Sequence, residues 1–277
     1  MTETRPPLID IGVNLTHRRF EADRDAVIAR AREAGIEHMI LTGIDGPGSA
    51  EAGNLAATNR ELFSATAGVH PHHARDWDDA TATALAHLAA NPTTVAIGET
   101  GLDFNRDFSP RPAQEAAFHA QLAMAVTRGL PAFLHQRDAH ERFLAILDEY
   151  LNHLPAAVVH CFTGGKQELK AYLDRDLHIG VTGWVCDERR GSELRSCVPD
   201  IPANRLMIET DAPFLLPRDI RPKPDGGRNE PAHLPHIAAA VASLRGESVA
   251  SVAANTTSVA RRFFGFEGGQ EQGGDAQ

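Results

Sequence analysis

The feature that most constrains the fold is a regular alternation of short apolar segments with amphipathic ones. Most of the apolar segments are aliphatic almost without a break, which is typical of strands buried on both faces of a parallel sheet. Strict alternation of such strands with helices predicts a parallel α/β architecture, and eight units fit a (β/α)₈ TIM barrel better than an open sheet. The eight predicted strands are 8–14, 38–44, 63–70, 94–102, 131–137, 156–162, 178–185 and 205–212.

The segments between these strands carry helical signals. Within 113–128, alanine and valine recur at helical spacing, and Gly129 followed by Pro131 is a typical stop signal. The predicted helices are 22–34, 113–128 and 138–151, with 231–244 and 247–264 closing the barrel.

The chain shows no linker that would divide it. The Pro- and Arg-rich stretch 217–231 follows the eighth strand and is interpreted as a long βα loop. We therefore expect one barrel domain over 8–266, a flexible N-terminus at 1–7 and a disordered tail at 267–277, where no apolar residue is larger than alanine.

Composition excludes several classes of protein. Of 277 residues, 42% are hydrophobic, too many for a disordered chain, yet no apolar run has the length of a membrane span. No signal peptide is visible, and 3 cysteines fit a reducing, cytoplasmic environment. The net charge of -10 disfavours unspecific adhesion to nucleic acid or anionic membranes. Nothing in the pattern requires a protein partner, so a monomer is expected.

Unusual polar residues follow the predicted strands at their carboxyl ends. In a parallel barrel these ends share one rim, where the βα loops leave and the chemistry of the fold collects. The residues at this rim include His70 and His72 after the third strand, Glu99 and Asp103 on the fourth, His135 and Arg137 on the fifth, His160 on the sixth and Asp211 on the eighth.

Four of these residues predict a divalent-cation site. His135 and His160 end consecutive strands at matching places, so their imidazoles should lie side by side. Alone, Glu99 could pair with Arg137, and Asp211 could be a helix cap or part of a buried ion pair. Together, two imidazoles and two carboxylates at one rim form a mixed nitrogen and oxygen set that suits a metal.

The charge of the rim differs from that of the whole chain. The window 218–228 holds four positive and two negative residues, in contrast to the acidic total. A solvated basic edge is the ordinary interpretation; a contact surface for an anionic substrate is the alternative.

The strand-end motifs resemble the TatD family of metal-dependent deoxyribonucleases. The resemblance runs in order from about Ile9 to Phe264, and it rests on 67–71 (AGVHP), 97–104 (IGETGLDF), 160–164 (HCFTG) and 209–213 (ETDAP). It implies a TIM-barrel hydrolase that depends on Mg²⁺ and degrades single-stranded DNA and RNA from the 3′ end. By position it makes Glu99, His135 and His160 metal ligands, and Asp211 a ligand or catalytic base.

One departure from the wider family concerns the first strand. Most members carry His-x-His there, whereas this chain has Gly12, Val13 and Asn14. Two nitrogen ligands are therefore missing, which argues against a tightly held pair of metals. The loss favours a hard cation such as Mg²⁺ or Mn²⁺ over Zn²⁺.

These features lead to a hypothesis of phosphodiester hydrolysis. A metal at Glu99, His135 and His160 would polarise the phosphate, and Asp211 would accept the proton of the attacking water. The residues expected to contact the substrate are His70, His72, Asp103, Arg137 and Trp184. Two alternatives remain open: hydrolysis of another ester or amide, such as an aminoacyl-tRNA, and nucleic-acid binding without turnover.

Overall fold

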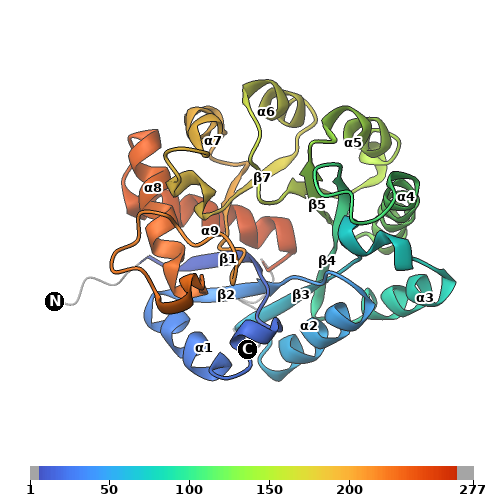
Figure 1. The fold of residues 1–277 in the computed structure, drawn as a ribbon, viewed down its shortest axis with the longest axis horizontal. Coiled ribbons are helices and arrows are strands. Elements are labelled where there is room, and N and C mark those ends of the chain that lie inside the picture. The colour runs from blue at the N-terminus through green and yellow to red at the C-terminus, as the bar shows by residue number, and fades with distance from the viewer. Residues whose placement is uncertain (1–5, 267–277) are drawn as a thin grey trace, which may run out of the picture.

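The computed structural model describes residues 6–266, the side chain of Asp225 excepted (Figure 1). The predicted disordered tail at 267–277 lies outside these residues, and so does most of the flexible N-terminus predicted at 1–7. Pro6 and Pro7, which are described, precede the first strand without regular secondary structure.

Eight parallel strands form one sheet in the order of the sequence. Val13 at the end of the first strand pairs with Ala212, just beyond the eighth, so the sheet curls into a nearly closed barrel. The predicted TIM-barrel fold is confirmed. The strands are β1 Leu8–Val13, β2 Ile36–Leu41, β3 Phe63–Ala67, β4 Thr94–Asp103, β5 Ala132–Arg137, β6 Ala157–Val159, β7 His178–Val181 and β8 Leu206–Ile208.

Helices surround the strands, as Figure 1 shows. The helices predicted from the sequence correspond to α1, α4, α5, α8 and α9, and α4 ends where expected, at Gly129 in the left-handed conformation with φ 63°. The helices are α1 Arg24–Glu33, α2 Gly46–Thr58, α3 Asp79–Leu88, α4 Arg111–Arg128, α5 His140–Leu147, α6 Lys166–Leu173, α7 Ser192–Cys197, α8 Leu234–Arg245 and α9 Val249–Phe264.

Six strands (β1, β2, β3, β6, β7 and β8) end before the residue that the sequence predicts, and after β6 and β8 the backbone bonds to side chains instead of to a neighbouring strand. β6 ends at Val159 instead of 162: Cys161 has a φ of 48°, and its backbone N–H donates to the Glu209 carboxylate at 2.6 Å. β8 ends at Ile208 instead of 212, and the Thr210 N–H donates to the Asp10 side chain. The chain thus leaves the regular sheet where polar side chains enter the barrel mouth.

Helix α9 closes the opposite end of the barrel. Its residues Val259, Ala260 and Phe263 pack in one buried cluster with side chains from inside the strands, including Ile11 and Phe133. This end is therefore a packed apolar core, and the open end is the one where the βα loops leave the sheet.

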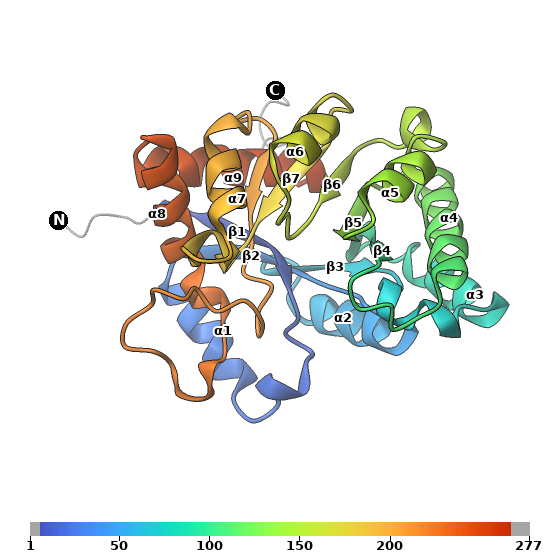
Figure 2. The ribbon, with the colours of Figure 1, turned by 45° about the horizontal axis from the view of Figure 1, so that its top comes forward.

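The long loop predicted after β8 is present. It connects Ile208 to α8 through short 3₁₀ turns and runs beside α1, as Figure 2 shows. Arg228 pairs with Asp23 at 2.7 Å, and Arg30 pairs with Glu230 at 2.7 Å, so salt bridges hold the loop against α1.

Cys161, Cys186 and Cys197 are free thiols. Within residues 6–266, no single helix is long and apolar enough to cross a membrane. The segments Pro231–Arg245 and Val249–Phe264 meet that test only as a pair, which is bent by 110°.

Candidate active site

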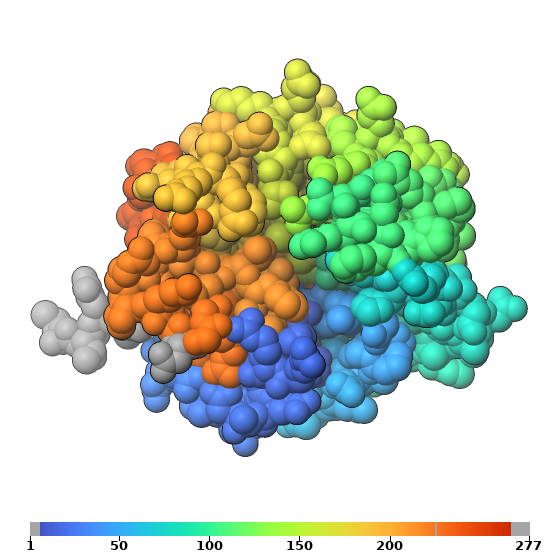
Figure 3. Space-filling model, in the orientation of Figure 1, coloured from blue at the N-terminus to red at the C-terminus, as the bar shows by residue number. Residues whose placement is uncertain are grey.

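The predicted site residues converge at the carboxyl end of the barrel. Glu99 and Asp103 lie on β4 and His135 on β5, whereas His70, His160 and Asp211 follow β3, β6 and β8. A cavity of about 500 Å³ is lined by every residue that the sequence placed in the site, together with Asn14, His17, Ile44, His73, Arg106, Cys161, Thr163, Phe214 and Leu215. Figure 3 shows a hollow near the middle of this face.

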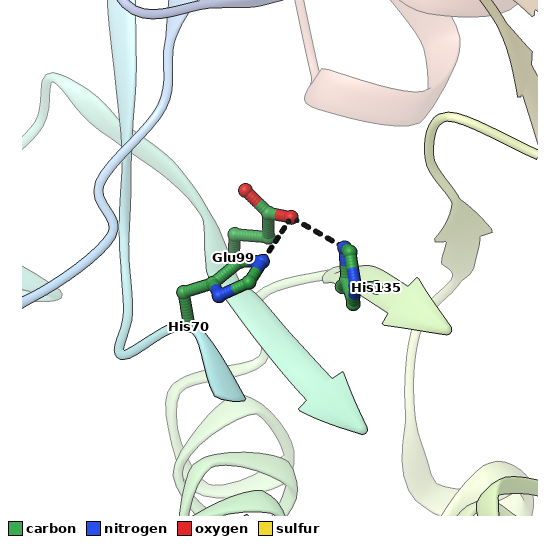
Figure 4. Close-up of side chains that lie close together, drawn as sticks. All are labelled: His70, Glu99 and His135. Atoms are coloured by element: carbon green, nitrogen blue, oxygen red, sulfur yellow. Dashed lines mark hydrogen bonds and ion pairs between the residues drawn. The ribbon is translucent and has the colours of Figure 1, made fainter. Parts of the chain in front are cut away.

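One oxygen of Glu99 is the centre of the site. Its Oε1 lies 2.9 Å from His135 Nδ1, 2.9 Å from His160 Nε2 and 3.3 Å from His70 Nε2. Figure 4 shows His70 and His135 pointing toward this carboxylate from neighbouring strands. Burial alone would raise the pKa of Glu99, but the imidazoles of His160, His70 and His135 hold it well below its usual range. Glu99 is therefore ionised and ready to bind a cation.

Asp103 holds one further imidazole, that of His72. Its Oδ2 bonds to His72 Nε2 at 2.8 Å and lies 3.5 Å from His135 Nε2, without hydrogen-bond geometry to the latter. Its other oxygen, Oδ1, accepts the backbone N–H groups of Asn105 and Arg106. Asp103 is thus fixed by the loop after β4, and it positions His72 at the edge of the cavity.

Glu209 is a site residue that the sequence reasoning missed. Its side chain is 0% exposed, and Oε2 bonds to His160 Nδ1 at 3.0 Å. A histidine that binds a metal through Nε2 commonly donates its Nδ1–H to such a carboxylate, which fixes the ring and its tautomer. The signal for Glu209 in the sequence is its position two residues before Asp211. Strand alternation does not predict the direction of its side chain, because Glu209 lies beyond the end of β8.

Gly12 and Gly180 lie against the buried Glu209 carboxylate. A Cβ atom at this position would overlap Glu209 Oε2, and one at Gly180 would lie 2.5 Å from Glu209 Oε1. Two glycines thus make the space that the Glu209 carboxylate occupies beneath His160. A side chain at residue 12 would therefore displace the Glu209 carboxylate from this position.

Asp211 lies on the other side of the cavity. Its Oδ1 accepts a hydrogen bond from Asn14 Nδ2 at 3.1 Å, and its φ of 52° directs it away from the line of β8. Burial raises the pKa of Asp211 to about 7, and nearby Glu99 and Glu209 add to the effect of burial. A carboxylate with this pKa can exchange a proton near neutral pH.

The donor set fits a divalent cation. His70, Glu99 and His135 offer ligand atoms that all lie within 4.8 Å of one another, and His160 contacts the same Glu99 oxygen. His135 Nε2 is buried without a hydrogen-bond partner in the described part of the chain. Imidazole nitrogens and carboxylate oxygens around one point are the ligands that such cations take. The fold and the site together define a TIM barrel with a histidine- and carboxylate-rich site whose ligand atoms fit a divalent metal.

Comparisons with known proteins agree with this class. Residues 9–265 match the family described as TatD related DNase. The "3'-5' ssDNA/RNA exonuclease TatD" of Erwinia amylovora is 56% identical over 94% of this chain and 100% of its own length. The Salmonella typhimurium protein of the same name is 54% identical, over 93% of this chain and 98% of its own.

Solved structures show the same relationship. The TatD homologue YJJV of Escherichia coli superposes with a TM-score of 0.86 at 26% identity, covering 93% of this chain and 98% of that one. A TatD-family hydrolase of Entamoeba histolytica gives 0.84 at 26% identity, covering 95% and 99%. The chain belongs to the TatD-related DNase family, it is a hydrolytic enzyme, and the family points to a divalent metal.

Proposed function

We propose that this protein is a divalent-metal-dependent exonuclease that removes nucleotides from the 3′ end of single-stranded DNA and RNA. The observation that carries the proposal is the Glu99 carboxylate, one oxygen of which meets three imidazoles beside an open cavity. Relatives that are 54% to 56% identical over almost the whole chain are named for this activity.

Glu99, His135, His160 and Asp211 are the proposed ligands, and His70 lies within reach of the same ion. The carboxylates and the missing nitrogen donors at residues 12 and 14 favour Mg²⁺, with Mn²⁺ as an effective substitute and Zn²⁺ less suited. When bound, the cation supplies positive charge that stabilises the phosphate in the transition state and makes a water molecule more acidic. Glu209 holds the His160 ring in the orientation that presents Nε2 to the site.

Asp211 is the proposed proton acceptor. Asn14 fixes Oδ1, while Oδ2 makes no hydrogen bond within residues 6–266 and can take the proton of the attacking water. Because burial raises its pKa to about 7, the carboxylate is a stronger base than an exposed aspartate.

The substrate enters past residues at the rim. Arg137 is exposed at the end of β5, and His72 is fixed by Asp103, so both can contact phosphate oxygens. Trp184 lines the cavity and offers an apolar surface to an unpaired base, a contact worth about 1–3 kcal/mol in single-strand binding proteins.

A single-stranded oligonucleotide labelled at its 5′ end tests the proposal. With Mg²⁺ we expect a ladder of products shortened from the 3′ end, and no products with EDTA. A charged tRNA assayed in parallel would report hydrolysis of an aminoacyl ester. Shortening from the 5′ end, or ester hydrolysis without nuclease activity, would contradict the proposal.

Two variants connect the activity to the site. Glu99→Ala and His160→Ala remove the central carboxylate and one of its imidazoles, so we expect both to abolish hydrolysis while circular dichroism remains that of the wild type. His87→Ala is the matched control, because His87 is exposed on α3, away from the cavity. Wild-type rates in the Glu99 variant would show that hydrolysis occurs elsewhere.

A further inference from the structure

A second cavity adjoins the active site. It has a volume of about 640 Å³, and Trp184 and Leu215 line both cavities. One wall comes from the turn after β7 and the other from the loop after β8, two segments that lie against each other in Figure 3. The two cavities therefore meet at Trp184 and Leu215.

The charge of this second cavity is opposite to that of the whole chain. Arg190, Arg218, Arg221 and Lys223 line it, and among the described side chains Asp187 is the one acidic lining residue. The chain as a whole has a net charge of -10. Positive residues gathered in a hollow of an acidic protein attract an anion to that place and not to the surface in general.

Asp187 orients two of the four cations. The side chain of Asp187 is only 4% exposed, and its Oδ2 lies 2.9 Å from Arg190 Nε and 3.7 Å from Arg218 Nη1. Because Arg190 uses Nε for this contact, its outer nitrogens stay available, and its guanidinium lies 4.5 Å from the centre of the Trp184 ring. Trp184, which lines both cavities, is thus held in place by the Asp187–Arg190 ion pair.

The other two cations have no acidic partner among the side chains that the structure describes. Arg221 donates to the backbone oxygens of Arg218 and Ile220, which shapes the loop and leaves its charge unbalanced. Lys223 is exposed and makes no hydrogen bond or ion pair with any residue that the structure describes. Both charges remain available to an anionic ligand.

We propose that this basic groove, formed by Arg190, Arg218, Arg221 and Lys223, binds the phosphates of single-stranded nucleic acid on the 5′ side of the nucleotide being removed. The inference rests on the proposed exonuclease function. In a 3′-to-5′ enzyme the terminal nucleotide occupies the active site, so the rest of the strand must leave the cavity in the 5′ direction. The groove that begins at Trp184 has the charge and the position to receive it.

The groove has a consequence for substrate length. A dinucleotide has one phosphate, which is the one hydrolysed, so it cannot use the groove. Longer strands place further phosphates there, and each contact releases a counterion from the strand. Long strands should therefore bind more tightly than a dinucleotide, and their affinity should decrease with salt.

The test compares two double variants. Arg218→Ala/Lys223→Ala removes two charges of the groove and leaves the Asp187–Arg190 pair intact. The control, Arg128→Ala/Arg262→Ala, removes two exposed charges at the C-terminal ends of α4 and α9, far from the mouth. Affinity for a twelve-nucleotide thymidine strand is measured by fluorescence anisotropy in EDTA over a range of salt concentrations. Steady-state hydrolysis of the same strand and of the thymidine dinucleotide is measured with Mg²⁺.

For the groove variant we expect the Kd and KM of the twelve-nucleotide strand to rise by about tenfold. The slope of log Kd against log salt concentration should decrease by about 1.4, which is the value for two lost phosphate contacts with a single strand. Hydrolysis of the dinucleotide and all values of the control should stay within twofold of the wild type. An unchanged Kd and salt slope would overturn the groove, and so would an equal loss for both substrates. Failure of the nuclease proposal itself would appear separately, as binding without hydrolysis by the wild type.

Discussion

Replacement of Glu209 by Gln tests how the site holds His160. The two side chains have nearly the same shape, but Gln has one acceptor oxygen where Glu has two. In the structure, Oε2 bonds to His160 Nδ1 at 3.0 Å and Oε1 accepts the Cys161 N–H at 2.6 Å. An amide can satisfy only one of these donors, so in the variant either the imidazole or the backbone of residue 161 loses its partner.

The size of the effect follows from the geometry. Loss of a carboxylate that orients a metal-binding histidine typically costs about 10–100-fold in metal affinity or activity. A buried donor left without an acceptor also costs about 1–3 kcal/mol of folding stability. We therefore expect the variant to fold with a lower melting temperature, and to need about 10–100-fold more metal for half-maximal rate.

The assay is a titration of hydrolysis with Mg²⁺ and with Mn²⁺, together with calorimetry of Mn²⁺ binding without substrate. Glu115→Gln is the matched control, because Glu115 pairs with Arg142 on the surface of the barrel. A Glu209→Gln variant with the metal midpoint and rate of the wild type would refute the orienting role of this residue.

Three further predictions concern neighbouring positions. Gly12→Ala should displace the Glu209 carboxylate. We therefore expect a loss of metal affinity like that of Glu209→Gln, measured by calorimetry, and a loss of about 1–3 kcal/mol of stability to overpacking, measured by denaturant titration. Unchanged values would show that the space beside Gly12 is not needed. Asp211→Asn should lower kcat by about 10²–10⁴-fold with little change in the melting temperature, as expected for a lost proton acceptor; a wild-type kcat would exclude it as the base. Burial raises the pKa of Asp10 to about 7. Because the folded state then holds this proton more tightly than the unfolded state, stability should be highest below about pH 4 for this group and should decrease up to about pH 7. Asp10→Asn should remove that part of the slope in denaturant titrations at several pH values, and an unaltered slope would contradict the assignment.

The buried carboxylates of the site are supported by residues of the first strand and its end. Gly12 and Gly180 leave the space for Glu209, and Asn14 donates a hydrogen bond to Asp211. These residues hold the carboxylates in place around the cluster of imidazoles at Glu99.

The sequence predicted the barrel and the rim because both depend on local pattern. Apolar strands alternate with amphipathic helices, and His135 and His160 end neighbouring strands at matching places, so parallel pairing brings them together. The sequence also placed Glu99, Asp103 and Asp211 at the mouth. It could not predict that Glu99 would be shared by three imidazoles, since that depends on how β3, β4, β5 and β6 are spaced around the barrel.

The sequence by itself therefore determined the order of the strands and which residues face the mouth, because the apolar runs of strands and the stop signals of helices act over short stretches of chain. Only the tertiary structure decided that Glu209 turns beneath His160 and that two cavities meet at Trp184. These contacts join residues far apart in the chain. They depend on barrel closure, on the absence of side chains at Gly12 and Gly180, and on the path of the loop after β8. No local sequence pattern predicts contacts of this kind.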